Sequence, residues 1–209
     1  PKTFYAAGLN YSEHVIEQAL ANNQEPNIPK EPHIGYRANN ALIAHNQPII
    51  KPSDSSEEFQ YEGELVAIIG KKTKNVSEQD ALNYVFGYTI GNDVSERKWQ
   101  RDDRTMWRAK NTDTFKPMGP WIETELDLNR LVTTVRINKV ETISFPTNNM
   151  IFGVACFISA MSKYLTLVPG DMIWMGTEGH SVNMKPGDIC EIEINKIGTL
   201  SNPIVLGNN

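Results

Sequence analysis

An apolar run with two glutamates directly before it, within FQYEGELVAIIG (residues 59–70), restricts how this chain can fold. The run Leu65–Ile69 is rich in β-branched residues and ends at Gly70, which predicts a strand buried on both faces. Side chains alternate along a strand, so Glu62 and Glu64 point to the same side, with Cα atoms about 7 Å apart. Two carboxylates at that spacing beside a core repel each other. We therefore expect a positive group between them, or protonation of one of them.

Length and charge limit the kind of protein that can carry such a strand. The chain has 209 residues, 40% hydrophobic and 22% charged, which predicts one globular domain over residues 1–209. The net charge of −5 argues against a nucleic-acid partner, because that binding needs surplus Lys and Arg. An anionic small molecule would need local positive charge. Cys156 and Cys190 are too few for a disulfide framework or a cysteine-rich metal site.

Two further expectations concern the location and the start of the chain. No apolar run approaches the ~20 residues that cross a bilayer, and no basic-then-apolar leader opens the sequence. We therefore expect no membrane partner and a cytoplasmic location. The opening Pro1, in place of Met, predicts a processed or truncated start that lacks an N-terminal extension.

The remaining segments predict more strands than helices. Strand-like segments recur at residues 4–9, 87–95, 121–123 and 131–138, and Pro-Gly-Asp turns at 169–171 and 186–188 each precede another strand. Apolar spacing and caps predict helices at residues 10–23, 78–86, 95–104 and 148–167. Residues 24 to about 52 and 108–120 have loop composition, and the first stretch is long enough for a functional lid. Because helices do not alternate regularly with strands, the pattern favours a mixed β (α+β) architecture over a doubly wound sheet.

A third carboxylate ends the next predicted strand. Asn92 and Asp93 close GYTIGND, where loops often carry chemistry on a rigid scaffold. Together with Glu62 and Glu64, Asp93 would supply three carboxylates, which suit a hard divalent cation such as Mg²⁺ or Mn²⁺. The alternative from spacing alone is that the glutamates are solvated and Asp93 caps the helix that follows.

Six motifs, read together and in order, resemble the fumarylacetoacetate hydrolase family. They are GLNYSEH (8–14), YEGELVAIIGK (61–71), GYTIGNDVSERKWQ (87–100), KNTDTFKPMGPWI (110–122), PGDMIWMGT (169–177) and KPGDICEIEINKIGTLSNPI (185–204). They cover nearly the whole chain. The resemblance, which is to the C-terminal catalytic domain type, implies a β-sandwich roll with a few peripheral helices that usually forms a homodimer. It also implies activity on 2-oxo acids, as acylpyruvate hydrolases, oxaloacetate decarboxylases or the isomerase–decarboxylases of aromatic breakdown.

The same resemblance implies roles for individual residues of this chain. Matching the motifs position by position gives the metal ligands Glu62, Glu64 and Asp93, the catalytic residues His14, Glu17 and Lys110, and the substrate-binding residues Arg97, Gln100 and Thr177. The implied cofactor is Mg²⁺ or Mn²⁺. His14 and Glu17 correspond to a dyad carried by a lid that orders when ligand binds.

The physical chemistry of these residues is compatible with the implied roles. His14 and Glu17 lie three apart on a predicted helix, where the carboxylate could raise the basicity of the imidazole. A loop ammonium at Lys110 could stabilise a developing enolate oxygen. Without the resemblance, a surface pair and a solvated lysine would be the simpler interpretations.

Two motifs depart from the commoner family pattern. After Asp93 the chain has Ser95–Glu96–Arg97–Lys98 in place of S-A-R-D, and after Thr177 it has Glu178–Gly179–His180–Ser181 in place of a glycine-rich tail. Both flank the substrate, so they bear on which substrate is used.

The sequence therefore predicts a divalent-metal-dependent enzyme that cleaves a carbon–carbon bond in a 2-oxo acid such as an acylpyruvate and releases pyruvate through an enolate. Two related alternatives are an isomerase or decarboxylase of 2-hydroxymuconate-type dicarboxylates and an oxaloacetate decarboxylase. A metal-stabilised binding protein is the alternative outside enzymes.

Overall fold

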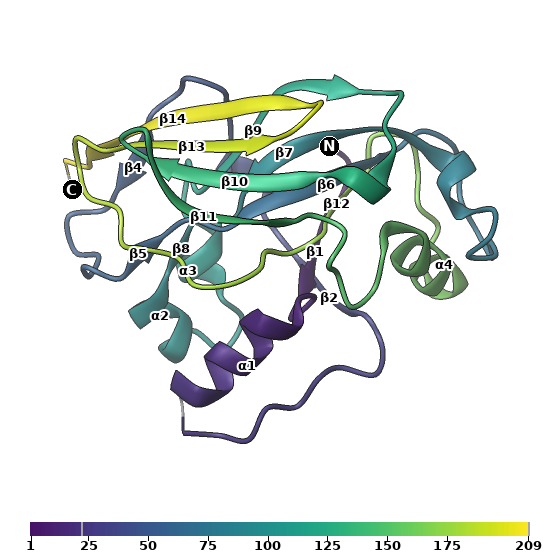
Figure 1. Cartoon of the computed structure of the whole chain (residues 1–209), viewed down its shortest axis with the longest axis horizontal. Coiled ribbons are helices and arrows are strands. Elements are labelled where there is room, and N and C mark those ends of the chain that lie inside the picture. The colour runs from purple at the N-terminus through teal and green to yellow at the C-terminus, as the bar shows by residue number, and fades with distance from the viewer. Residues whose placement is uncertain (22, 209) are drawn as a thin grey trace.

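Two β-sheets packed face to face form the body of the molecule, and the helices lie at its periphery (Figure 1). The computed structural model describes residues 1–21 and 23–208. Within these residues the larger sheet has seven strands in the order β2-β1-β12-β6-β7-β9-β3. Their bounds are β1 Phe4–Gly8, β2 His33–Tyr36, β3 Leu42–Ala44, β6 Gly63–Ile69, β7 Val85–Asn92, β9 Lys116–Glu123 and β12 Met172–Trp174.

The second sheet has five strands in the order β11-β10-β13-β14-β4, and a two-stranded ladder joins β5 to β8. The bounds of these strands are β4 Ile49–Lys51, β5 Phe59–Gln60, β8 Ser95–Glu96, β10 Val132–Ile137, β11 Val140–Pro146, β13 Ile189–Ile194 and β14 Gly198–Leu206. The mixed β architecture expected from the sequence is confirmed: β1–β12, β3–β9 and β14–β4 pair in parallel, and the other strand pairs of the two sheets are antiparallel.

Strand β6 explains why the run before Gly70 is apolar on both faces. Leu65, Ala67 and Ile69 belong to the main core between the two sheets. Val66 and Ile68 point the other way and join a second, smaller cluster around Trp174. The alternation that predicted a strand buried on both sides therefore holds.

A glycine on the neighbouring strand makes room for the second cluster. Gly91 of β7 pairs with Glu64 of β6, and a Cβ atom at Gly91 would lie 2.5 Å from the Trp174 ring. The ring therefore occupies the space of a missing side chain. Phe4 packs against the same ring, with centroids 4.8 Å apart.

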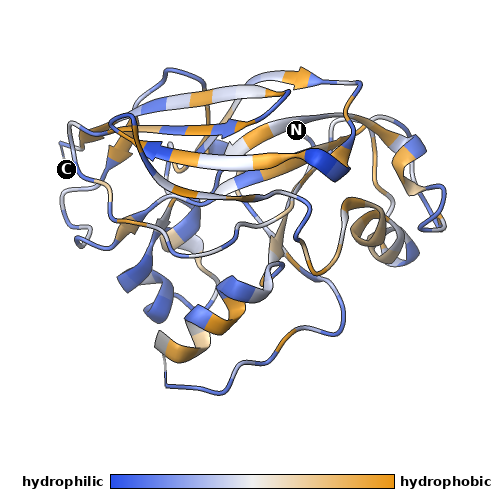
Figure 2. Ribbon diagram, in the orientation of Figure 1, coloured by the Kyte–Doolittle hydropathy of each residue, from blue (hydrophilic) through white to orange (hydrophobic). Residues whose placement is uncertain are grey.

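The helices lie around the sheets and carry both hydrophilic and hydrophobic stretches (Figures 1 and 2). The α-helices are α1 Ser12–Ala21, α2 Arg97–Asp102, α3 Trp107–Asn111 and α4 Val154–Tyr164, and the 3₁₀ turns are η1 Asn39–Ala41, η2 Ala81–Tyr84 and η3 Leu128–Arg130. The α1 helix lies within the predicted range 10–23, although the predicted end at Asn22 lies outside the described residues. None of the described helices is long and apolar enough to cross a membrane.

Three expectations about local structure were wrong. The helix expected at residues 78–86 is only the η2 turn, because Val85 and Phe86 already belong to β7. The helix expected at 148–167 is confined to α4, and Asn10 binds the backbone of Phe152 before it. The long stretch from residue 24 to 52 holds β2, β3 and β4 and is not continuous loop.

The fourth correction bears on function. The stretch at residues 108–120, expected as a loop, contains most of helix α3 and the start of β9. Lys110 therefore lies on a helix. The carboxylate of Asp103 caps this helix by accepting from the backbone N–H groups of Arg108 and Ala109 at 3.1 and 2.8 Å.

Candidate active site

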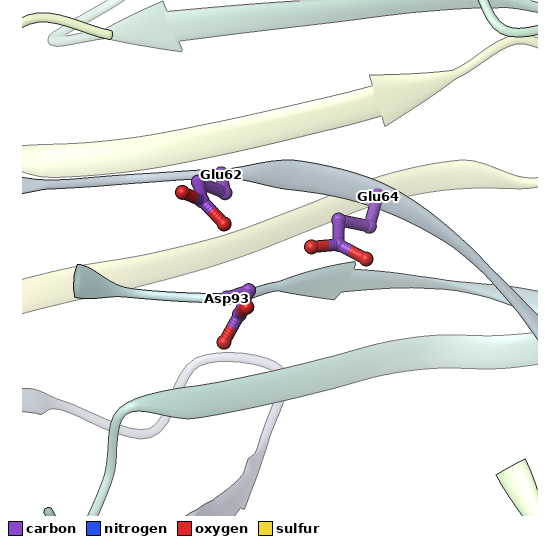
Figure 3. A group of neighbouring side chains, drawn as sticks. All are labelled: Glu62, Glu64 and Asp93. Atoms are coloured by element: carbon purple, nitrogen blue, oxygen red, sulfur yellow. The ribbon is translucent and has the colours of Figure 1, made fainter. Parts of the chain in front are cut away.

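Three carboxylates from two adjacent strands meet at one end of the larger sheet (Figure 3). Glu62 directly precedes β6, Glu64 lies in it, and Asp93 directly follows β7. The antiparallel register pairs Gly63 with Asn92, which brings Asp93 beside Glu62. One oxygen of each carboxylate lies within 4.8 Å of the others, and all three residues are buried.

Backbone and amide groups hold the three carboxylates in place. The N–H of Asp93 donates to the Glu62 carbonyl at 2.9 Å, and the Glu62 N–H donates to the Asn92 side chain at 3.0 Å. The Glu64 carboxylate accepts from the Gly176 N–H at 2.7 Å. The triad is thus fixed by the strand ladder and not by flexible side chains.

Cations surround two of the three carboxylates. Glu62 contacts Lys110 at 2.6 Å and Arg97 at 2.7 Å. Asp93 contacts Arg37 at 2.8 Å, Lys110 at 3.0 Å and Lys116 at 2.7 Å. Cations therefore lie beside Glu62 and Asp93, whereas no ion pair to Glu64 is found among the described residues.

The same contacts give the carboxylates opposite proton affinities. Burial opposes the ionisation of Glu62, but Lys110 and Arg97 outweigh it and lower its pKa to about 2. Burial is likewise overcome at Asp93, whose pKa lies well below its usual range beside Arg37 and Lys110. Glu64 differs, because burial and the charges of Asp93 and Glu62 raise its pKa well above the usual range. Of the two possibilities anticipated from the sequence, the first applies to Glu62, which has positive neighbours, and the raised pKa of Glu64 favours the second, a protonated carboxyl.

The donor set fits a hard divalent cation. Mg²⁺ and Mn²⁺ favour carboxylate oxygens held close together, and the triad offers three such oxygens in a buried position. Glu64, which the surrounding anions disfavour in its charged form, would gain the counter-charge that it lacks. The alternative of solvated glutamates is excluded by their burial.

A cavity of about 200 Å³ opens beside the triad. The described residues that line it are Ala7, Gly8, Leu9, Asn10, His14, Arg37, Glu62, Glu64, Gln100, Met106, Lys110, Gly176 and Thr177. Six of the nine predicted site residues are among them, namely His14, Glu62, Glu64, Gln100, Lys110 and Thr177. Asp93 does not line the cavity, but it contacts the lining residues Arg37 and Lys110.

The predicted histidine–glutamate pair is divided between the cavity and the surface. The Nδ1 atom of His14 lies 3.1 Å from the Gly179 carbonyl, and burial lowers the pKa of His14. Glu17 lies on the same helix but is exposed and does not line the cavity. With Nδ1–H donating to Gly179, the Nε2 atom of His14 carries the basic lone pair.

The predicted substrate-binding residues also differ in position. Gln100 and Thr177 line the cavity. Arg97 lies behind it, where its guanidinium contacts Glu62 and donates to Gln60 at 2.8 Å and to Gln100 at 2.9 Å. Arg97 thus connects the triad to Gln100.

Sequence reasoning missed two cations of the site. Arg37 lies just after β2, in the stretch expected to be loop, and no pattern around it indicated a long-range partner. Lys116 is fully buried at the start of β9, and its ammonium also donates to the carbonyls of Val94 and Phe115. Its place between Phe115 and Pro117, in an otherwise apolar stretch, was the signal available. Burial lowers the pKa of Lys116 to about 7 although Asp93 favours its charged form.

The sandwich of sheets and the buried acidic centre beside a polar cavity define a β-rich enzyme with a carboxylate site for a divalent metal. The chain belongs to the fumarylacetoacetate hydrolase family: the family described as fumarylacetoacetate (FAA) hydrolase C-terminal matches residues 3–205. The resemblance seen in the sequence is thereby confirmed.

Curated relatives carry several related names. A fumarylacetoacetate hydrolase domain-containing protein 2 homolog of Dictyostelium discoideum is 40% identical over 98% of this chain and 72% of its own. A mitochondrial oxaloacetate tautomerase of Xenopus laevis is 36% identical over 98% of this chain and 66% of its own.

Solved structures confirm the fold. A 5-carboxymethyl-2-hydroxymuconate delta-isomerase from Mycobacterium smegmatis has a TM-score of 0.88 and 36% identity, covering 99% of this chain and 80% of its own. A maleylpyruvate hydrolase from Sphingobium sp. SYK-6, solved with manganese(II) and pyruvate, has a TM-score of 0.82 and 27% identity, covering 100% of this chain and 72% of its own.

Proposed function

We propose that this protein is a Mg²⁺- or Mn²⁺-dependent enzyme that cleaves a carbon–carbon bond in a 2-oxo acid such as an acylpyruvate and releases pyruvate. The observation that carries the proposal is the buried triad of Glu62, Glu64 and Asp93 beside a cavity that also holds Lys110 and His14. The manganese and pyruvate bound by the similar maleylpyruvate hydrolase support it.

Glu62, Glu64 and Asp93 would hold the cation, which when bound supplies positive charge for the oxygens of the 2-oxo acid. Thr177 and Gln100 donate hydrogen bonds that orient the substrate carboxylate. Lys110, which contacts Glu62 and Asp93, brings an ammonium close to the oxygen where enolate charge develops.

His14 supplies the base. Its Nε2 atom removes a proton from water, and the resulting hydroxide adds to the distal carbonyl carbon. The bond between that carbon and the adjacent methylene then breaks, and its electron pair forms the pyruvate enolate. Protonation of the enolate carbon by the imidazolium gives pyruvate and returns His14 to its neutral form, while the acyl group leaves as a carboxylic acid.

A keto–enol reaction of oxaloacetate is a second candidate. The name of the Xenopus laevis relative favours it, and it needs a base such as His14 but no water. Isomerase activity on hydroxymuconate-type dicarboxylates, with or without decarboxylation, is a third; the name of the mycobacterial structure supports the isomerase activity. Exposed Glu17 would have to turn inward to assist His14 in any of these reactions.

Pyruvate release distinguishes the candidates. Acetylpyruvate, fumarylpyruvate and oxaloacetate are each assayed with and without Mg²⁺ or Mn²⁺, using the unmodified protein and His14→Ala, with the exposed Glu125→Gln as a matched control. Metal-dependent release from an acylpyruvate that His14→Ala abolishes supports the hydrolase. Enol-to-keto conversion of oxaloacetate without pyruvate release supports the tautomerase, and no reaction of any substrate contradicts the proposal.

Assembly and location are proposed separately. We propose a homodimer and a cytoplasmic location, on the family resemblance and the sequence composition respectively. Light scattering on a size-exclusion column tests the dimer, and a monomer at micromolar concentration would contradict it.

A further inference from the structure

Met106 occupies a defined place in the cavity, one helical turn before Lys110. It is the N-terminal flanking residue of α3, and the Lys110 N–H donates to its carbonyl at 3.1 Å. Both side chains line the cavity. The two side chains therefore face the same cavity.

The two side chains differ in depth. Lys110 is 4% exposed and contacts the carboxylate triad, whereas Met106 is 38% exposed. Lys110 therefore marks the floor of the cavity and Met106 its mouth. A 2-oxo acid whose carboxylate end lies at the triad would extend its distal end toward Met106.

The backbone of Met106 is held in a conformation that few side chains adopt. Its φ of 55° is left-handed. Its N–H donates to the Asp103 carbonyl at 3.0 Å, and its carbonyl accepts from the Asn111 side chain at 3.0 Å. Residues held in this region by surrounding hydrogen bonds cluster at ligand-binding positions.

The side chain assigned to the mouth, Met106, is apolar. Arg37, the guanidinium that lines the cavity, already binds both oxygens of Asp93. Lys110 likewise binds Glu62 and Asp93. A distal carboxylate on the substrate would lose water against the Met106 side chain without gaining an ion pair there, whereas a methyl or alkyl group would be buried favourably.

We infer that Met106 determines which group the substrate carries beyond the bond that is cleaved, and that it selects 2-oxo acids with an uncharged distal group over those with a distal carboxylate. This inference rests on the proposed function, because it assumes that a 2-oxo acid lies with its carboxylate end at the triad.

The test measures binding without turnover, by titration calorimetry on the Mn²⁺-loaded protein. 2-Oxopentanoate and 2-oxoglutarate have the same chain length and differ at the distal end, which is a methyl group in the first and a carboxylate in the second. We expect the unmodified protein and Met106→Leu to bind 2-oxopentanoate more tightly than 2-oxoglutarate. Met106→Lys should shift the ratio of the two dissociation constants about tenfold or more toward 2-oxoglutarate.

Two controls separate a local effect from a general one. Trp107→Lys adds the same charge at the next residue, which is exposed and does not line the cavity, and should leave the ratio unchanged. Oxalate, which has no distal group, should bind equally to the protein with Met106 and with Met106→Lys.

The outcomes are distinct. Tighter binding of 2-oxoglutarate by the unmodified protein, or an unchanged ratio in Met106→Lys, overturns the inference. Absence of pyruvate release with normal selective binding overturns the proposed reaction alone. If neither 2-oxo acid binds, both fail.

Discussion

Glu62 and Glu64, only two positions apart, show how strongly the neighbours of a residue decide its charge. Lys110 and Arg97 keep Glu62 ionised, whereas Glu64 accepts a backbone N–H and faces two anions. The site therefore contains one carboxylate that a divalent cation would relieve of repulsion. Its substitution should affect metal binding far more than folding.

We expect Glu64→Gln to lower the affinity for Mn²⁺ at least about 100-fold. The melting temperature of the metal-free protein should not fall, because glutamine still accepts from the Gly176 N–H and is neutral, like the protonated form that the raised pKa of Glu64 favours. Calorimetric Mn²⁺ titration and thermal unfolding check both statements, with Glu125→Gln as the surface control. Unchanged Mn²⁺ affinity would remove Glu64 from the metal site.

The position of His14 gives a prediction about pH. Burial lowers its pKa below the usual 6.5, so the imidazole is neutral and basic at neutral pH. Activity that depends on this base should fall only when the pH drops through the lowered pKa. The acid limb of a kcat/KM profile should therefore lie below pH 6.5, and the residual activity of His14→Ala should lack that limb. An acid limb at or above pH 6.5 would contradict the assignment.

At the scale of elements, the start of α1 is tied to two other parts of the chain. The Asn10 side chain donates to the carbonyls of Phe152 and Met175 at 3.1 and 2.8 Å and accepts from the Phe152 N–H at 3.0 Å. It thus joins the helix that carries His14 to the segment that carries Gly176 and Thr177.

Loss of this connection should cost stability. We expect Asn10→Ala to lower the free energy of unfolding by roughly 3 kcal/mol, since buried backbone groups lose their partners. Urea unfolding measures the change. Asn39→Ala, which removes one exposed hydrogen bond to the Pro1 carbonyl, is the matched control and should be near neutral. Equal effects of the two substitutions would show that Asn10 does not have this role.

The elements that could be predicted from the sequence are those with a long periodic signal. Leu65–Ile69 alternates between two cores as expected, and strand β7, which ends directly before Asp93, follows from its own pattern. Helix α3 could not be predicted, because five residues show no periodicity and its cap, Asp103, lies outside it. Arg37 was missed for a related reason, since its partner Asp93 is 56 positions away.

The whole molecule is acidic, but four of its cations gather at the acidic triad. The net charge is −5, yet Arg37, Arg97, Lys110 and Lys116 all contact the acidic triad. These cations offset most of the repulsion among the carboxylates. The fold should therefore not require a metal ion.

Metal removal provides the corresponding prediction. Treatment with a chelator should leave the circular dichroism spectrum unchanged, and Mn²⁺ alone should raise the melting temperature only modestly. Oxalate added with Mn²⁺ should stabilise further, by about 2.7 kcal/mol at a 100-fold excess over its Kd. Unfolding on chelation would identify the ion as structural.

The contact between Gly91 and the Trp174 ring limits how this sequence can diverge. Because the Trp174 ring fills the space that a Cβ atom at position 91 would occupy, Gly91 can be replaced only once Trp174 has changed. Among descendants of this chain, a larger residue at 91 should arise only in lineages that have already replaced the tryptophan. The residues that position 91 can accept therefore depend on the residue at position 174, although the two are far apart in the sequence. This dependence lies directly beside Glu64 of the acidic triad.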